Sequence, residues 1–160
     1  IRKLTDDLTW IGGIDRKIQK FENVYKLNSG MNYNSYFLDC GATVLFDTVG
    51  SETADIFFEN MEFCLAGRTL DYVVVHHMEP DHSANIADFM QYYKNAQIVS
   101  SEKAFAMMKN FFGTDFADNR IVVGEGDTLC LGTSRKSLDE IEDTLLIIAT
   151  GTLHGIAAFA

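Results

Sequence analysis

The chain has 160 residues, 47% of them hydrophobic and 22% charged, a composition typical of one folded globular domain and not of a disordered chain. Its 13 basic and 23 acidic residues give a formal net charge of −10, which argues against nucleic acid and anionic membranes as partners. The chain has three cysteines, Cys40, Cys64 and Cys130, and no two of them form a C-x-x-C pair. We therefore expect buried structural thiols, and neither a disulfide framework nor a thiolate metal site. No apolar signal-peptide core follows Ile1, and we therefore expect a cytoplasmic protein.

The sequence of the first part of the chain predicts three strands and a helix. Residues 8–11, 34–40 and 43–47 have strand character, and Gly41-Ala42 is the expected hairpin turn between the last two. Ser51 is the expected cap of a helix, because the apolar residues after it recur at helical spacing: Ala54, Phe57, Phe58, Met61 and Leu65.

The middle of the chain alternates strands with helices. The unbroken apolar run at residues 72–75 predicts a central strand covered on both faces. Further strands are expected at 96–99, 121–123 and 128–131. Two apolar stripes predict helices, one with Ile86, Phe89, Met90 and Tyr93, the other between Ser101 and Gly113 with Ala104, Met107, Met108 and Phe111. This order predicts an α/β protein with a partly parallel sheet covered by helices.

Four potential metal ligands follow the 72–75 strand within six residues: His77, Glu79, Asp81 and His82. In an extended segment residues two apart face the same side, so His77, Glu79 and Asp81 are expected to converge on one point, and His82 to face a second point nearby. Pro80 stiffens this turn. The pattern favours a loop that serves two metals over the alternative, an ordinary polar loop.

His76 precedes this pattern and is out of phase with it. It lies at the end of the predicted strand, one residue before the alternating positions. We expect a hydrogen-bonded neighbour of the ligands and not a ligand.

The motif His77-x-Glu79-x-Asp81-His82 resembles the metal-binding loop of the metallo-β-lactamase superfamily, which is usually His-x-His-x-Asp-His. With glutamate at the second position, the motif resembles that of one branch of the superfamily, the flavodiiron proteins. Residues 1–132 carry the resemblance, through Trp10-Ile11-Gly12-Gly13, Phe21-Glu22-Asn23, Tyr33-Asn34-Ser35-Tyr36, Val44-Leu45-Phe46-Asp47-Thr48, Glu79-Pro80-Asp81-His82-Ser83 and Gly126-Asp127-Thr128-Leu129. It implies the N-terminal half of a metallo-β-lactamase-like αββα sandwich.

The resemblance also implies a two-iron oxidoreductase that reduces dioxygen to water or nitric oxide to nitrous oxide. By position, His77 and Glu79 would bind the first iron, and Asp81 and His82 the second. Asp47 would orient a ligand; a strand-ending turn aspartate is the equally favoured alternative. A carboxylate in place of imidazole shifts preference from zinc toward iron or manganese. The implied partners are an electron-donor protein such as a rubredoxin or a flavoprotein, and a second copy of the chain.

After Gly132 the motifs stop. The family's Pro-x-x-His-Trp segment and its FMN-binding flavodoxin-like domain are absent from this sequence, so we expect residues 133–160 to be a divergent tail. We also expect the isolated chain to bind metal weakly. In one interpretation residues 145–149 are a displaced strand and His154 is a late ligand. In the other, which we favour, Ser137 and Glu140 form a capping box before a helix and the tail is foreign sequence.

Two other functions remain alternatives at this point. One is a zinc-dependent hydrolase of the same superfamily, which Glu79 disfavours. The other is a non-catalytic truncated fragment, which the missing ligand segments favour.

Overall fold

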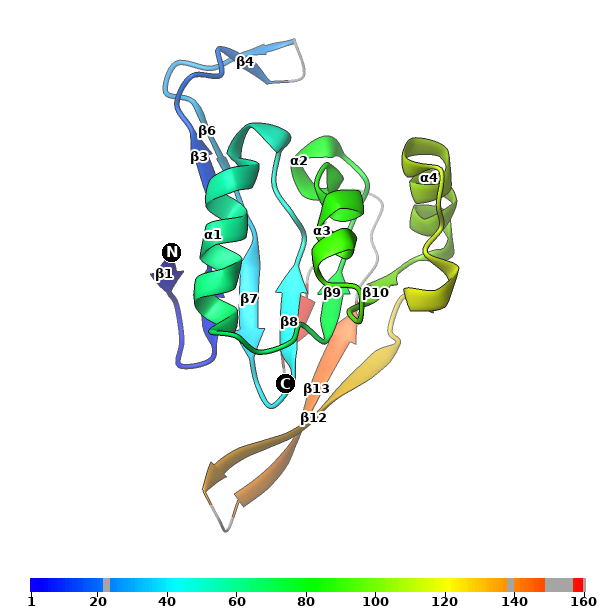
Figure 1. Ribbon diagram of the computed structural model, residues 1–160. Helices are drawn as coiled ribbons and strands as arrows, with labels where there is room; N and C mark the ends of the chain where they lie inside the picture. The colour runs from blue at the N-terminus through cyan, green and yellow to red at the C-terminus, as the bar shows by residue number, and fades with distance from the viewer. Residues whose placement is uncertain (22–23, 138–139, 149–156, 160) are drawn as a thin grey trace.

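The computed structural model describes residues 1–21, 24–137, 140–148 and 157–159, and a seven-stranded mixed sheet forms its centre (Figure 1). The strand order is β1-β2-β7-β8-β9-β10-β11. Neighbours are antiparallel as far as β8 and parallel from β8 to β11. The strands are β1 (Arg2–Lys3), β2 (Leu8–Trp10), β7 (Tyr36–Asp39), β8 (Thr43–Phe46), β9 (Tyr72–Val74), β10 (Gln97–Ser100) and β11 (Arg120–Val122).

The helices cover one face of this sheet (Figure 1). They are α1 (Ala54–Leu65), α2 (Pro80–Ser83), α3 (Ile86–Tyr92) and α4 (Glu102–Phe112), with short 3-10 turns η1 (Ser51–Thr53) and η2 (Ala117–Asn119). The predicted α/β class with a partly parallel sheet is therefore confirmed. Among the described residues, no helix is both long and apolar enough to cross a membrane.

The core has two parts because successive strand residues face opposite sides of the sheet. Leu45, Val73 and Ile98 join the buried cluster under the helices. Val44 and Val74 join a second cluster on the opposite face, which also includes Phe46, Val99 and Leu131. Both faces of β9 are thus buried, as its unbroken apolar run predicts.

Helix boundaries follow local chemistry at α4 and depart from the prediction at α1. The Ser101 hydroxyl accepts a hydrogen bond from the Ala104 N–H at 3.2 Å, and Gly113 ends α4 in the left-handed conformation, φ 76°. Ser51 is not the cap of α1, since it begins η1 and α1 starts only at Ala54. Ala66 ends α1 in the left-handed region at φ 51°, where an alanine is strained.

Residues 13–33 form a projection that we call the arm. It consists of two hairpins, β3 (Gly13–Asp15) with β6 (Met31–Tyr33) and β4 (Lys20–Phe21) with β5 (Tyr25–Lys26). The arm extends past the end of the sheet at which β8 and β9 finish (Figure 1). Its strands have two or three residues and no apolar alternation, so the sequence did not indicate them.

The chain after residue 127 forms a separate three-stranded sheet. Its strands are β12 (Thr128–Ser137), β13 (Glu140–Ile148) and β14 (Ala157–Phe159). The helix expected after Ser137 and Glu140 is therefore wrong, whereas the strand expected at 145–149 agrees as far as Ile148; residue 149 and His154 lie outside the described residues. The prediction of three buried cysteines is also wrong, because only Cys40 is buried, Cys64 is half-buried and Cys130 is exposed on β12.

Candidate metal centre

All four predicted ligands lie in the connection between β9 and α3, which we call the metal loop (residues 76–82). The backbone is extended at Glu79, φ −68° and ψ 145°, and turns into α2 at Pro80, the first helical residue. Proline suits this position because the first helical N–H has no partner within the helix. The loop therefore changes from extended to helical backbone between Glu79 and Asp81.

The change of backbone separates the four side chains into two pairs. Nδ1 of His77 lies 3.9 Å from Oε2 of Glu79, and Nε2 of His82 lies 3.5 Å from Oδ2 of Asp81. The two histidine rings are adjacent, with centroids 4.1 Å apart. The predicted convergence of His77, Glu79 and Asp81 is wrong, since no three His, Cys, Asp or Glu side chains in the described part of the chain lie close enough to hold one ion. That prediction assumed an extended backbone, in which every second side chain faces the same side, and the assumption fails where α2 begins.

Asp47 lies behind the metal loop, directly after β8, and its carboxylate binds two histidines. Oδ2 lies 3.0 Å from Nδ1 of His76 and 2.9 Å from Nδ1 of His82, and Oδ1 accepts the His76 N–H at 2.8 Å. The residue has a left-handed backbone, φ 56°, which aspartate tolerates better than most side chains. His76 is thus hydrogen-bonded, as the sequence predicts.

Burial and hydrogen bonding act in opposite directions on the Asp47 carboxyl. Burial raises its pKa, but the hydrogen bonds from His76 and His82 outweigh this and hold the pKa at about 2. The carboxylate is therefore ionised at neutral pH and can only accept hydrogen bonds. Both Nδ1 atoms must carry the proton, so the free nitrogen of neutral His82 is Nε2, the atom that faces Asp81.

The pKa values of the two predicted histidine ligands, His77 and His82, shift in opposite directions. For His82, burial lowers the pKa, but the hydrogen bond to Asp47 and the nearby carboxylates reverse this and leave it raised above 6.5. For His77, burial and the neighbouring His82 lower the pKa below 6.5. His77 is thus neutral, the form that binds metals, over a wider pH range than His82.

Hydrogen bonds between the segment after β8 and residues 82–85 fix the end of the metal loop. The N–H and hydroxyl of Thr48 both donate to the His82 carbonyl at 2.8 Å, and the Asn85 amide donates to the Val49 carbonyl at 2.5 Å. The Ser83 hydroxyl donates within the loop, to the carbonyls of Met78 and Glu79. Sequence reasoning missed these residues; Thr48 and Ser83 were visible only as neighbours of the charged motif residues.

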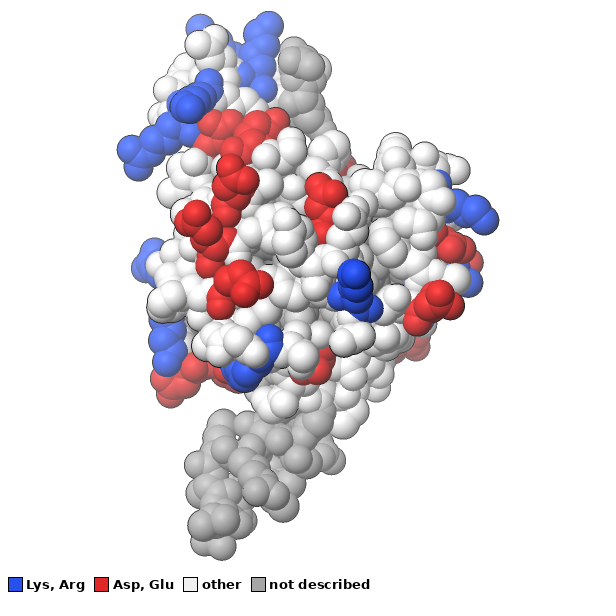
Figure 2. All heavy atoms as spheres, in the orientation of Figure 1, with Lys and Arg blue, Asp and Glu red and all other residues white. Residues whose placement is uncertain are grey.

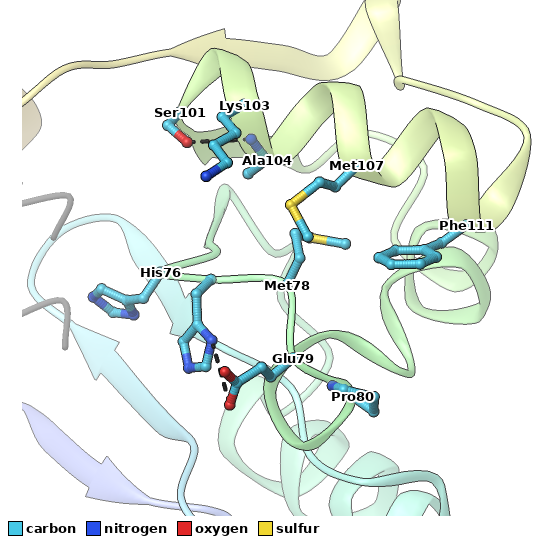
Figure 3. A pocket seen from close by; sticks show the side chains of 10 residues that line it. His76, Met78, Glu79, Pro80, Ser101, Lys103, Ala104, Met107 and Phe111 are labelled. Atoms are coloured by element: carbon cyan, nitrogen blue, oxygen red, sulfur yellow. Dashed lines mark hydrogen bonds and ion pairs between the residues drawn. The ribbon is translucent and has the colours of Figure 1, made fainter. Parts of the chain in front are cut away.

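A pocket of about 560 Å³ opens between the metal loop and α4 (Figure 3). The loop contributes His77, Met78 and Glu79 to its lining, and Met107 and Phe111 reach toward it from α4. This volume lies within the usual range for small-ligand sites. The His77–Glu79 pair therefore borders a largely apolar space.

The donor atoms of each pair fit one metal ion. Metal bonds to histidine nitrogen and carboxylate oxygen are about 2.0–2.2 Å long, so two donors on one ion lie at most roughly 4.2 Å apart. The separations of 3.9 Å and 3.5 Å satisfy this limit. Asp47 adds the outer carboxylate that commonly orients a ligating histidine.

Comparison with known proteins gives a consistent result. The profile described as "Metallo-beta-lactamase superfamily" matches residues 29–156, a range that continues past Gly132. The chain is 27% identical over 133 residues to the flavo-diiron protein FprA2 of Clostridium acetobutylicum, covering 83% of this chain and 33% of that protein. It is 29% identical over 145 residues to a nitric oxide reductase of Moorella thermoacetica, covering 89% and 35%.

A solved structure extends the similarity to three dimensions. Rubredoxin oxygen:oxidoreductase from Desulfovibrio gigas matches with a TM-score of 0.83 at 25% identity, over 98% of this chain and 38% of that chain. The chain spans about a third of the length of the two curated relatives described above. The predicted sandwich half and the resemblance to flavodiiron proteins are confirmed by these matches.

Proposed function

Because this chain belongs to the metallo-β-lactamase superfamily, we propose that it is part of a diiron oxidoreductase that reduces dioxygen to water or nitric oxide to nitrous oxide. The printed names of its relatives support both substrates, since one is a nitric oxide reductase and another is a rubredoxin oxygen:oxidoreductase. The proposal concerns the portion of such an enzyme that these 160 residues match.

The observation that carries the proposal is the division of the metal loop into two histidine–carboxylate pairs. His77 with Glu79 would hold one iron, and Asp81 with His82 the other. Each pair offers one imidazole and one carboxylate, a set that suits iron better than the imidazole-rich sets typical of zinc. Bound iron would supply reversible one-electron chemistry, which hydrolysis does not need.

The remaining residues of the site prepare the ligands. Asp47 fixes the His82 ring with Nε2 free, and Thr48 fixes the His82 backbone through its carbonyl. Met78, Met107 and Phe111 line the pocket beside the His77–Glu79 pair with apolar side chains, while the Glu79 side chain stays 55% exposed. The chain's own residues thus orient the donors and make one side of the pair apolar.

Two further requirements are part of the proposal. Electrons would come from FMN on a flavodoxin-like domain and from a donor protein such as a rubredoxin or a flavoprotein. The substrates are small diatomic molecules, for which the apolar pocket offers no steric barrier. The proposal also places the enzyme in the cytoplasm, as a homo-oligomer.

Metal competition tests the proposal. The purified chain is dialysed anaerobically against equimolar ferrous iron and zinc, and the bound metals are quantified by mass spectrometry. While the chain is in equilibrium with both metals, we expect its ratio of bound iron to bound zinc to exceed that of a chain with a His-x-His loop. The variant Glu79→His recreates that loop, and we expect it to shift the retained metal toward zinc.

A matched variant separates the site from nonspecific binding. Glu59→His makes the same substitution on the exposed surface of α1 and should leave the iron-to-zinc ratio unchanged. Zinc retention by the wild-type chain together with hydrolysis of an ester or amide substrate would contradict the proposal and support the hydrolase alternative.

A further inference from the structure

Tyr93 and Glu62 form a short hydrogen bond that plays no part in the metal centre. Tyr93 directly follows α3, Glu62 lies on α1, and the two helices lie side by side over the sheet (Figure 1). The Tyr93 hydroxyl donates to Oε1 of Glu62 at 2.5 Å. Hydrogen bonds of this length between a hydroxyl and a carboxylate are among the strongest in proteins. The pair thus holds a phenol against its own proton acceptor.

The position of Tyr93 is fixed by its backbone and by its ring. Its N–H donates to the Phe89 carbonyl at 2.9 Å, and its carbonyl accepts the Ala96 N–H at 3.0 Å. The ring packs on that of Phe89, which is fully buried, with centroids 4.4 Å apart. The Tyr93 ring therefore lies at the edge of the core, and its hydroxyl points outward to α1.

The acceptor lies on an acidic surface. Asp55, Glu59 and Glu62 are exposed on α1, and residues 51–65 contain no lysine or arginine. Figure 2 shows red side chains along this helix. Negative charge near a ring favours the removal of an electron from it, because the positive charge that develops on the ring is attracted to the carboxylates. The surroundings of Tyr93 therefore favour its oxidation.

The Tyr93 hydroxyl keeps its proton as long as the ring is reduced. Burial, the hydrogen bond to Glu62 and the charge of Glu62 all raise the pKa of Tyr93 above its ordinary value of 10.0. A phenol that has lost an electron is a strong acid, and its proton then leaves. The Glu62 carboxylate is within hydrogen-bond reach of that proton and can accept it directly.

The neighbouring tyrosine lacks this arrangement. Tyr92 is 75% exposed, and its ring packs on that of Phe58 with centroids 5.3 Å apart. Of the chain's six tyrosines, all of them within the described residues, only Tyr93 donates a hydrogen bond to a carboxylate there. Tyr92 is thus more accessible to a reagent in solution, whereas Tyr93 has the built-in acceptor.

We propose that Tyr93 is a redox-active tyrosine, which gives one electron to a strong one-electron oxidant while Glu62 takes its proton. The phenol O–H bond breaks, the proton moves to the Glu62 carboxylate, and the electron reduces the oxidant. The products are a neutral tyrosyl radical and a carboxylic acid hydrogen-bonded to it. A reductant that returns one electron restores Tyr93, and Glu62 gives the proton back.

The role of the pair rests on the proposed function, but its redox property does not. An enzyme that reduces dioxygen handles strongly oxidising species. A tyrosine that is oxidised reversibly protects other side chains from them when the electron donor is exhausted. The redox property belongs to Tyr93 and Glu62 themselves, so it can be measured without any metal.

Photo-oxidation of the full chain tests the proposal. A laser flash on ruthenium tris-bipyridine, with an electron acceptor present, generates a one-electron oxidant in solution. The tyrosyl radical is then followed by its absorption and by electron paramagnetic resonance. We expect a tyrosyl radical in the wild-type chain and the loss of most of it in Tyr93→Phe. Glu62→Gln keeps the size of the acceptor but not its basicity, and it should slow radical formation roughly tenfold or more.

Two readouts separate proton transfer from a merely structural effect of Glu62. With a built-in acceptor, the rate should be independent of buffer concentration and flat between about pH 6 and pH 8, both far below the ordinary tyrosine pKa of about 10. In Glu62→Gln the proton must pass to solvent or buffer, so the rate should rise with the concentration of buffer base. Circular dichroism verifies that each variant is folded.

Tyr92→Phe is the matched control, since it removes the more exposed phenol at the adjacent position. It should leave the yield and rate of the radical close to those of wild type. Loss of the radical in Tyr92→Phe and not in Tyr93→Phe would show that exposure alone selects the tyrosine, and it overturns the proposal. So does a folded Glu62→Gln chain that forms the radical at the wild-type rate. The metal competition experiment is separate, and its failure would remove the protective role but not the redox pair.

Discussion

Replacing Asp47 by asparagine removes the charge that binds two histidines but keeps the size of the side chain. Asparagine also tolerates the left-handed backbone found at this position, φ 56°, so the substitution should not disturb the turn after β8. The variant Asp47→Asn therefore removes the charge and one of the two acceptor oxygens while the size of the side chain is kept. We expect it to lower the free energy of unfolding.

The magnitude follows from the pKa of Asp47. Its pKa falls from 3.8 to about 2 in the folded protein, and each unit corresponds to about 1.4 kcal/mol, so the ionised carboxyl stabilises the fold by roughly 2–3 kcal/mol. The folded pKa is depressed, so this contribution is present above pH 3.8 and is lost as the pH falls toward 2.

His82 sets the upper limit of the pH range in which the contacts of Asp47 stabilise the fold most. Its folded pKa is raised above 6.5, so its contribution is complete below pH 6.5 and is lost as the pH rises through the folded value. Both contributions coexist only between pH 3.8 and 6.5. The stability difference between wild type and Asp47→Asn should therefore be largest near pH 5 and smaller on either side.

Urea unfolding followed by circular dichroism, at about pH 3, 5 and 8, measures this difference. Asp88→Asn is the matched control, an exposed aspartate on α3 whose loss should change stability by about 0.5 kcal/mol or less. Equal stability of wild type and Asp47→Asn near pH 5 would refute the reasoning. A difference that does not shrink toward pH 3 would refute the assignment to the Asp47 carboxyl.

Three further predictions concern metal binding and stability. The chain offered two equivalents of iron should lose most of it on desalting and show little oxygen or nitric oxide reductase activity, because the metal loop supplies two ligands per iron; tight binding of two irons that His154→Ala abolishes would contradict this. Ala66→Gly should stabilise the protein by about 0.5–1 kcal/mol in thermal unfolding by relieving a left-handed alanine, while Ala106→Gly within α4 should destabilise it. Phe57→Ala should cost about 3–5 kcal/mol in urea unfolding, and a cost no larger than that of the exposed Phe63→Ala would contradict the core assignment.

Sequence patterns predicted the elements that bury long apolar surfaces. The apolar run at residues 72–75 contains the central strand β9. Helix α4 begins after Ser101 and ends at Gly113, as expected. Such elements are predictable because burial on one or both faces imposes a period on the sequence. The arm is buried only at its base, where Tyr33 joins the core, and its strands of two or three residues are too short to show a period.

The four ligands were predictable as a group but not in their arrangement. Period-two alternation placed Asp81 beside His77 and Glu79, and it assumed an extended backbone throughout the metal loop. Pro80 was visible in the sequence as a stiffening residue, but proline suits an extended turn and the first residue of a helix alike. Only the fold shows that α2 begins there and turns Asp81 toward His82.

The position of Asp47 follows from the parallel pairing of β8 and β9. Phe46 and Val74 are partners in register, so the chain leaves both strands at the same edge of the sheet, and the Asp47 N–H donates to the Val74 carbonyl. The left-handed turn at Asp47 then directs its carboxylate to His76 at the start of the metal loop and to His82 at its end. One buried charge thus holds both ends of the loop against the sheet before any metal binds. A loop held in this way loses less conformational freedom on binding than a mobile one, and for this reason a residue that contacts no metal can affect metal affinity.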